Sequence, residues 1–200
     1  TLIDQKSQMG GQFNLAMQIP GKEDFNHTLT YFTNELERLK VTVELSKAYD
    51  DSMLKDYDDI VFATGVRPRE ASIKCSDDKR VFAYDEVIRG EVELGKSIAI
   101  LGAGGIGFDM VAFLSEHKSQ SISEFKTQWG IECDAQPHKD ERQLYMLKRS
   151  SGRFGSELGK TTGWIHRQVA KQHGVKQIAD CQYQSFDKNG STINVAGEVQ

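Results

Sequence analysis

Hydrophobic and polar residues recur with different periods along the chain, and these periods predict an α/β fold. Apolar side chains at helical spacing predict an amphipathic helix between residues 22 and 40, at positions Phe25, Leu29, Phe32, Leu36 and Leu39. Short apolar runs predict strands at 41–45 and 60–63, and a helical turn is expected at 84–89. The polar stretch 66–80 contains proline and is expected to be a connecting loop.

The second half of the chain predicts a βαβ unit. A strand at 98–101, a helix at 106–115 and a strand at 143–149 follow one another, across an unusually long crossover at 116–141 that includes a possible helix at 122–129. A helix at 161–173, strands at 175–178, 182–186 and 192–195, and a hairpin turn at 187–190 complete the expected elements. With a hinge at 91–96, the expected domains are 1–95 and 96–200.

A glycine-rich turn between strand and helix is the strongest motif in the sequence. It reads Gly102-Ala103-Gly104-Gly105-Ile106-Gly107, a G-x-G-x-x-G that follows an apolar strand and precedes an apolar helix. In the dinucleotide fingerprint Gly102 permits a tight turn, Gly104 lets the backbone approach a pyrophosphate, and Gly107 permits close helix–strand packing. The helix N-terminus offers N–H groups to the phosphates. The context favours a nucleotide site over a purely structural turn.

The strand predicted at 143–149 ends in basic residues, at the position that distinguishes the two nicotinamide cofactors. An NAD site usually has an acid there, whereas a basic residue accommodates the 2′-phosphate of NADP. Arg149 is expected to bind this phosphate through its guanidinium fork, assisted by Lys148 and Ser150. The alternative is a charged strand end that points into water. With the glycine motif upstream, the pattern favours NADP(H).

Three segments of the first domain fit a flavin site. Asp4 closes an apolar strand, where an acid accepts hydrogen bonds from an adenosine ribose. The stretch Gly10-Gly11-Gln12 contains paired glycines that let a backbone lie against a cofactor. The stretch Ala63-Thr64-Gly65 comes at the end of the strand expected at 60–63. Each feature alone is compatible with a solvated aspartate or an ordinary turn, and together they predict part of an FAD-binding domain.

The stretch Gly155 to Thr162, GSELGKTT, looks like a phosphate loop but fails on spacing. The Walker pattern needs four residues between its first glycine and Gly-Lys, and three separate Gly155 from Gly159. We expect a loop and a helix start, with Thr161 or Thr162 as the N-cap. The five histidines lack metal-ligand spacing, and neither a Ser-His-Asp set nor paired carboxylates are evident. No catalytic residue and no metal site is predicted.

Composition narrows the class of protein. The 200 residues are 38% hydrophobic and 27% charged, with a net charge of −4, which gives no general attraction to nucleic acid or anionic membranes. No apolar run reaches the roughly 18 residues of a membrane span. The three cysteines, Cys75, Cys133 and Cys181, are far apart, and lone thiols suit a reducing cytoplasm. Both ends read as interrupted strands, so a fragment of a longer chain is expected.

These motifs resemble the C-terminal region of the bacterial NADPH-dependent 2,4-dienoyl-CoA reductases, iron–sulfur flavoenzymes related to trimethylamine dehydrogenase. The resemblance covers almost the whole chain. It is carried by Gly10–Gly21, Ala63–Pro68, Ile98–Asp109, Met146–Arg149 and, most specifically, Leu158–Arg167 (LGKTTGWIHR). It implies a Rossmann-like NADP(H)-binding domain inserted into a partial, truncated FAD-binding domain.

In that family NADPH reduces FAD, electrons cross an iron–sulfur cluster (4Fe–4S) to FMN, and FMN reduces a 2,4-dienoyl-CoA in the β-oxidation of unsaturated fatty acids. The resemblance implies that Asp4, Gly11, Gln12 and Gly65 lie at the FAD. It implies that Gly102 to Gly107 and Arg149 lie at the NADPH. The sequence lacks the N-terminal FMN-binding barrel, the cluster cysteines, the first flavin phosphate loop and the closing FAD segment. The chain alone is therefore expected to be inactive, with that barrel as its missing partner.

Two other functions stay open on the sequence. One is the same module in a related enoate reductase or amine dehydrogenase, although a 2′-phosphate site argues against the amine branch. The other is a non-catalytic NADP-binding module.

Overall fold

The computed structural model describes residues 1–69, 73–75, 80–115, 121–128, 131, 142–187, 190–195 and 197–199. The chain forms two compact units, Thr1–Pro68 and Arg69–Gln200, each of which is described by itself. The predicted division at 95/96 concerns cofactor domains and stays a prediction. Among the described residues, no helix combines the length and the apolar character needed to cross a lipid bilayer.

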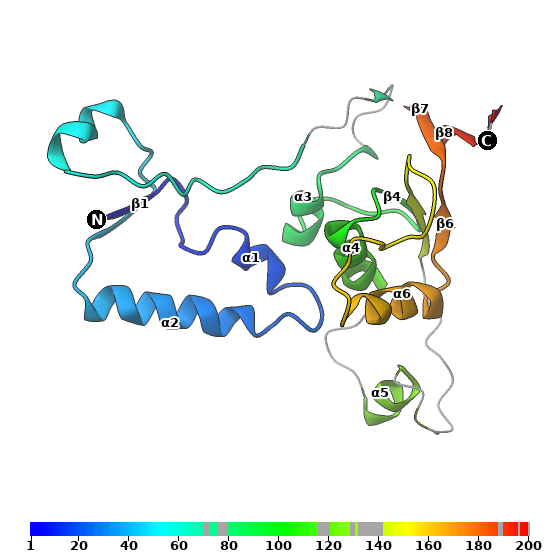
Figure 1. Ribbon diagram of the computed structural model, residues 1–200, viewed down its shortest axis with the longest axis horizontal. Helices are drawn as coiled ribbons and strands as arrows, with labels where there is room; N and C mark the ends of the chain where they lie inside the picture. The colour runs from blue at the N-terminus through cyan, green and yellow to red at the C-terminus, as the bar shows by residue number, and fades with distance from the viewer. Residues whose placement is uncertain are drawn as a thin grey trace. The chain divides into compact units, whose positions relative to one another are not determined.

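Unit 1 is a small arrangement of two parallel strands and short helices (Figure 1). Its elements are β1 (Leu2–Asp4), α1 (Phe13–Ala16), α2 (Phe25–Arg38), β2 (Val43–Leu45) and the 3₁₀ helix η1 (Asp51–Asp56). β1 pairs with β2 in parallel, with Leu2 opposite Val43. The helix and strand predicted at 22–40 and 41–45 are thus present with slightly narrower bounds, and α1 was not predicted.

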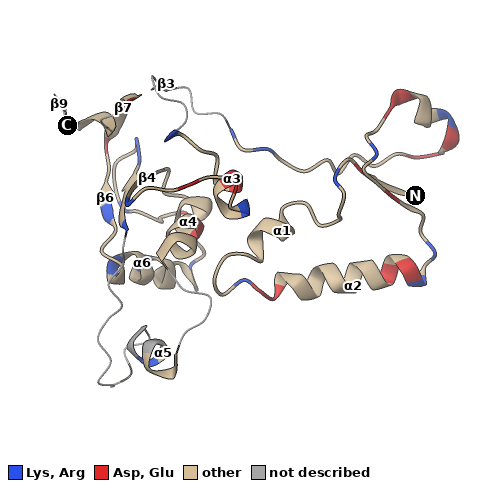
Figure 2. Ribbon diagram, turned by 180° about the vertical axis from the view of Figure 1, so that it is seen from behind, with Lys and Arg blue, Asp and Glu red and all other residues tan. Residues whose placement is uncertain are grey.

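The apolar stripe of α2 stays largely uncovered within unit 1. Phe32 is 58% exposed and Leu39 is 59% exposed, and the buried apolar side chains of this unit are Leu15 and Ile19. Figure 2 shows the charges of α2 at its C-terminal end only, with the rest of the helix uncharged. Helical periodicity therefore predicted the helix. The other elements of unit 1 are too small to bury the whole apolar face of α2.

The prediction of a buried strand at 60–63 is wrong. These residues form no strand, Val61 is 87% exposed and Phe62 is 63% exposed. A parallel strand needs the backbone of a neighbour for its N–H and C=O groups. Within residues 1–68, all of which the structure describes, the two strands pair with each other and neither pairs with this segment.

Unit 2 is built on a parallel sheet and a second, mixed sheet. Its elements are β3 (Lys74–Cys75), α3 (Tyr84–Arg89), β4 (Ser97–Leu101), α4 (Gly105–Ser115), α5 (Ile122–Gln128), β5 (Gln143–Leu147), α6 (Gly163–Gln172), β6 (Lys176–Ile178), β7 (Cys181–Asp187), β8 (Gly190–Val195) and β9 (Glu198–Val199). β4, β5 and β6 form one parallel sheet in that order. The strand order and the crossovers through α4 and α6 are those of a Rossmann-like mononucleotide half.

Alternate residues of β5 face two different cores. Leu144 and Met146 pack with Phe108 and Val111 of α4 and with a buried residue of α6, on the face that these helices cover. Leu147 faces the opposite way, onto Cys181 and a second cluster built from β7 and β8. This is the two-residue period of a strand buried on both sides. The predicted βαβ unit is confirmed, with β5 ending at Leu147 rather than at residue 149.

The second sheet has the order β3-β7-β8-β9, with β3 parallel to β7 and the other pairs antiparallel. Asp187 pairs with Gly190, while the middle of the predicted hairpin turn lies outside the described residues. β3 falls in the stretch 66–80 that was expected to be a loop, and β9 pairs with β8. Most of the long crossover 116–141 also lies outside the described residues, apart from residues 121–128, which include α5, and residue 131.

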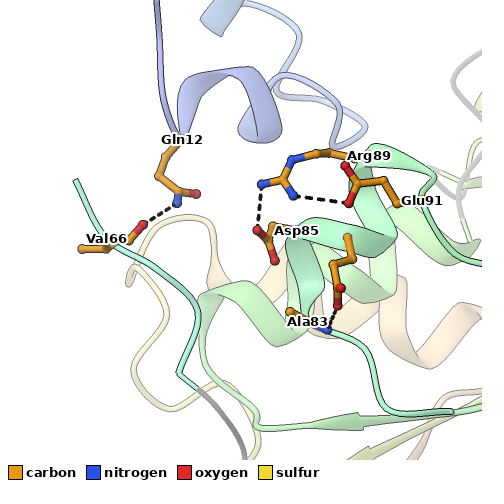
Figure 3. Close-up of polar contacts among 7 residues, drawn as sticks. Gln12, Val66, Ala83, Asp85, Arg89 and Glu91 are labelled. Carbon is orange, nitrogen blue, oxygen red and sulfur yellow. Dashed lines mark hydrogen bonds and ion pairs between the residues drawn. The ribbon is translucent and has the colours of Figure 1, made fainter. Parts of the chain in front are cut away.

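Local sequence fixes α3, the helical turn predicted at 84–89. The backbone N–H of Ala83 donates to the Glu86 carboxylate at 2.7 Å, which caps the first turn (Figure 3). Arg89 binds Asp85 at 2.7 Å one turn earlier. Gly90 ends the helix with a φ of 72°, the left-handed conformation that glycine adopts most easily.

Candidate nucleotide-binding site

The glycine turn joins β4 to α4 and touches the end of β5. Gly102 has a φ of 116°, and its N–H donates to the Leu147 carbonyl at 2.8 Å. Gly107 is buried, and a Cβ there would lie 2.5 Å from the Gly102 carbonyl oxygen. These two glycines are therefore required by the backbone itself, one for its conformation and the other for the close approach of helix and strand.

The middle of the turn is open. A Cβ built on Gly104 or on Gly105 would meet no atom within 4 Å, and both residues are exposed. Gly105 is the first residue of α4, and the Phe108 N–H donates to the Gly104 carbonyl at 3.2 Å. Ile106 is 53% exposed in the first helical turn. Since the first N–H groups of an α-helix lack intrahelical acceptors, this open turn suits an anionic group.

Basic residues follow β5 next to this turn. Arg149 and Ser150 are exposed, two and three residues beyond the Leu147 carbonyl that holds Gly102. Arg153, which the sequence analysis did not single out, is exposed in the same loop. Its signal in the sequence was a second arginine in the polar run that begins at Arg149. The structure thus brings the glycine motif and the basic strand end together.

Lys148 differs from its neighbours because it is 8% exposed. Its ammonium donates to the carbonyls of Ser151 at 2.9 Å and Arg153 at 3.1 Å, and lies 4.9 Å from the centre of the Phe154 ring. A direct contact between this ammonium and a cofactor stays a prediction.

Two side chains of β7 tie that strand to the end of β5. Tyr183 donates its hydroxyl to the Leu147 carbonyl at 3.0 Å, and the Cys181 thiol lies 3.2 Å from the Lys148 carbonyl. Burial raises the pKa of Tyr183 to about 12, and the positive charge of Arg149 opposes this shift. Burial also raises the pKa of the Cys181 thiol, which packs in a core cluster with Leu147 and Ile193.

The segment that leads into α6, which includes the stretch Leu158–Arg167, packs against α4. Gly155 has a φ of 66°, and a Cβ there would lie 3.0 Å from the Phe108 ring. Arg167 of α6 donates to the Gly155 carbonyl at 3.0 Å. Thr162 occupies the N-cap position of α6, but its hydroxyl makes no capping hydrogen bond. The expected loop and helix start are confirmed. Thr162 is the N-cap residue, as predicted, but the side-chain hydrogen bond of a typical N-cap is absent.

In unit 1, one hydrogen bond joins two of the predicted flavin segments. The Gln12 side chain donates to the Val66 carbonyl at 3.2 Å (Figure 3), which holds Gly10-Gly11-Gln12 beside the stretch that contains Ala63-Thr64-Gly65. Gly10, Gly11 and Gly65 all have positive φ, of 112°, 48° and 73°. The residues at 63–65 are exposed, as a ligand contact requires.

Asp4 ends β1, and its carboxylate accepts the Lys6 N–H at 2.8 Å. This bond fixes the carboxylate beside its own backbone and leaves acceptor capacity for another donor. Binding of FAD by Asp4 and by the other residues of unit 1 stays a prediction.

Comparison with known proteins identifies the family. The sequence model of the pyridine nucleotide-disulphide oxidoreductases matches residues 9–200. The chain belongs to this family. As a pyridine nucleotide-disulphide oxidoreductase it is an FAD- and NAD(P)-binding oxidoreductase domain, and the match includes both the glycine turn and the end of β5.

Two curated relatives of this oxidoreductase domain are reductases. A metal reductase of Desulforamulus reducens is 25% identical over 98% of this chain and 31% of its own length. A bilirubin reductase of Mediterraneibacter gnavus is 28% identical over 58% of this chain and 18% of its own length. The chain therefore spans less than a third of these relatives.

Two solved structures share the fold of this pyridine nucleotide-disulphide oxidoreductase chain. A 2-naphthoyl-CoA reductase matches with a TM-score of 0.75 at 19% identity, over 99% of this chain and 27% of its own. Histamine dehydrogenase from Rhizobium sp. 4-9 matches with a TM-score of 0.68 at 13% identity, over 100% of this chain and 30% of its own.

Proposed function

We propose that this chain is the electron-input part of a larger NADPH-dependent flavin oxidoreductase, in which hydride passes from NADPH to FAD. One observation carries the choice of NADPH. The Gly102–Leu147 hydrogen bond of 2.8 Å sets the glycine turn beside the end of β5, and the exposed cation Arg149 follows there where an NAD site usually has an acid.

The residues present fit the phosphates of a nicotinamide cofactor. The pyrophosphate would lie against Gly104, Gly105 and Ile106, where the turn is open and the α4 N-terminus favours negative charge. The guanidinium of Arg149 and the hydroxyl of Ser150 would hold the 2′-phosphate. A guanidinium fork matches two phosphate oxygens, whereas a carboxylate at this position would repel them.

The flavin would be held by unit 1. Asp4 would accept hydrogen bonds from the adenosine ribose, Gly11 and Gln12 would pass close to the cofactor, and Gly65 would turn the chain beneath it. Gln12 would also fix the distance between the two loops through its bond to Val66. When both cofactors are bound, the nicotinamide supplies the hydride and the flavin accepts it, and the role of this chain is to orient them.

A related enzyme supports the choice of NADPH. An engineered water-forming NADPH oxidase matches this chain with a TM-score of 0.50 at 17% identity. That enzyme was bound to NADPH, and its substitutions remove one aspartate and introduce two arginines and a serine. Arg149 and Ser150 are residues of the same two types.

For the whole protein we propose reduction of a 2,4-dienoyl-CoA in unsaturated fatty acid β-oxidation. FMN and an iron–sulfur cluster would then be bound outside this chain, and the reducing conditions that suit its lone thiols would be those of the cytoplasm. The motif Leu158–Arg167 supports this proposal. A fold match to a reductase in complex with 2-naphthoyl-CoA, an aromatic acyl-CoA, is compatible with it.

Cofactor titration tests the proposed function. Calorimetry on the chain is expected to give tighter binding of NADPH than of NADH, and Arg149→Ala is expected to weaken NADPH binding by about 1.5–3 kcal/mol, the scale of a charged hydrogen bond. Arg142→Ala is the matched control, because Arg142 is an exposed arginine that precedes the other end of β5. Equal affinities for NADPH and NADH, before and after the Arg149 substitution, would refute the assignment.

Substrate choice is tested on the whole protein that contains this chain. NADPH oxidation should be stimulated by a 2,4-dienoyl-CoA and not by a simple enone or an amine. Stimulation by an enone or an amine alone would favour the enoate reductase or amine dehydrogenase alternatives. NADPH binding without flavin reduction would favour a non-catalytic module.

A further inference from the structure

The geometry points to Lys148 as the residue that positions the 2′-phosphate loop, residues 149–153, rather than as a ligand of the phosphate. This inference rests on the proposed function, because the loop matters only if Arg149 binds the 2′-phosphate. It adds a positioning residue to the site, because the buried ammonium at the end of β5 would hold residues 149–153 in place.

The ammonium of Lys148 is turned inward onto its own loop. It donates to the carbonyls of Ser151 and Arg153 at 2.9 and 3.1 Å and lies over the ring of Phe154 at 4.9 Å. A lysine ammonium has three donors, and two of them serve these carbonyls. The ring is a further favourable neighbour for a cation. With the residue 8% exposed, these contacts direct the charge away from solvent.

The backbone of Lys148 is held from both sides as well. Its N–H donates to the Ile178 carbonyl at 3.0 Å, and its carbonyl accepts the Cys181 N–H at 3.2 Å. The Ser150 carbonyl accepts the Asp180 N–H at 3.3 Å. Arg149 therefore lies between two residues whose backbones are fixed to the turn between β6 and β7, while its own side chain is exposed.

These contacts close the loop into a defined shape before any cofactor binds. The chain leaves β5 at Leu147, turns through residues 149–153 and is held by the Lys148 ammonium at two points, 151 and 153. The side chains of Arg149, Ser150 and Arg153 are left exposed on this loop. A loop that is already ordered binds its ligand more tightly, because no conformational entropy has to be lost when the ligand binds.

Replacing the ammonium should loosen the loop and selectively weaken binding of the phosphorylated cofactor. In Lys148→Met the aliphatic stem and its packing are kept, and both hydrogen bonds to carbonyls are lost. We expect the Kd for NADPH to rise about five- to thirtyfold, the scale of a 1–2 kcal/mol ordering cost. The Kd for NADH should change less than about twofold, because NADH has no 2′-phosphate for the loop to hold.

A direct ligand role would give a similar single-variant result, and a double-mutant cycle separates the two. If Lys148 acts through the loop that carries Arg149, Lys148→Met should add little in an Arg149→Ala background. If both cations contact the phosphate independently, the two effects on NADPH affinity should add. Additive effects would overturn the inference.

The experiment is a calorimetric titration of the chain with NADPH and with NADH. It compares the wild type, Lys148→Met, Arg149→Ala, the double variant and Lys176→Met. Lys176 is the matched control, because it is an exposed lysine of the same sheet whose ammonium also lies near an aromatic ring, that of Tyr145. Lys176→Met should leave both Kd values unchanged. An unchanged ratio of NADPH to NADH affinity in Lys148→Met would overturn the inference, whereas a wild type without preference for NADPH would overturn the proposed function.

Hydrogen exchange without cofactor gives a readout that is independent of NADPH binding. Amides 150–155 should exchange faster in Lys148→Met, while those of β4 and α4 keep their wild-type rates. Unchanged exchange at 150–155 would overturn the inference. If Lys148→Met does not fold, Phe154→Leu replaces it: it removes the ring beneath the ammonium, keeps an apolar side chain, and should shift exchange and NADPH affinity in the same direction.

Discussion

Adding one methyl group to Gly107 is expected to destabilise unit 2, although alanine is the better helix former. Gly107, the last glycine of the turn, lies in α4 directly against the backbone of Gly102, the residue that follows β4. A Cβ there would lie 2.5 Å from the carbonyl oxygen of Gly102 and 3.2 Å from its carbonyl carbon. Both atoms belong to the backbone of a turn that is tied to Leu147, so they have no rotamer by which to move away.

The magnitude follows from two opposing effects. Overpacking of a well-packed contact costs about 1–3 kcal/mol. Replacing glycine by alanine inside a helix gains about 1 kcal/mol. Gly105→Ala is the matched control, because Gly105 belongs to the same helix and its Cβ would meet no atom within 4 Å. Since the helix gain is similar in both variants, Gly107→Ala should be less stable than Gly105→Ala by about 1–3 kcal/mol.

Urea unfolding followed by tryptophan fluorescence measures this difference. Both tryptophans of the chain, Trp129 and Trp164, fall within unit 2, so the signal reports that unit and not unit 1. The two free energies of unfolding are compared with the same slope of unfolding free energy against urea concentration in both variants. If Gly107→Ala were as stable as Gly105→Ala, helix and strand would not approach as closely as described, and Gly107 would not be needed for packing.

Two further perturbations have defined outcomes. Gly104→Val should weaken NADPH binding at least about tenfold by calorimetry, because its side chain enters the open space where the pyrophosphate would lie. It should change the free energy of unfolding by less than about 1 kcal/mol, as is usual at an exposed position. Unchanged affinity would place the pyrophosphate elsewhere. Tyr183 has its pKa raised to about 12, so its contribution to stability is complete below pH about 10 and is lost as pH rises toward 12. Tyr183→Phe should cost about 0.5–1.5 kcal/mol at neutral pH, through loss of the hydrogen bond to Leu147, and should flatten the decline of stability between those pH values. An equally steep decline in urea unfolding of this variant would show that another group is responsible.

Strong local patterns allowed the sequence to predict most elements of unit 2. The apolar runs of β4 and β5 and the glycine turn between them specify a βαβ unit without help from distant residues. The helix α3 was predictable for the same reason, because Glu86 and Gly90 define its two ends. The segment 60–63 was not, since apolar residues predict a strand only where another strand is available to pair with them.

The sequence by itself determined the glycine turn and the basic residues after β5, because each is a property of neighbouring residues. Its match over residues 9–200 also determined the broad oxidoreductase family, while the narrower resemblance to dienoyl-CoA reductases stays a proposal. Only the tertiary structure decided what these residues do for one another. It placed Gly102 against Leu147 across the sheet and turned Lys148 inward while Arg149 faces solvent. Lys148, Arg149 and Ser150 are three adjacent polar residues that a sequence pattern cannot tell apart. Strand pleating and the carbonyls of the following loop give each of them a different environment. Which carbonyls bind the lysine depends on the path of that loop, and no local pattern predicts this path.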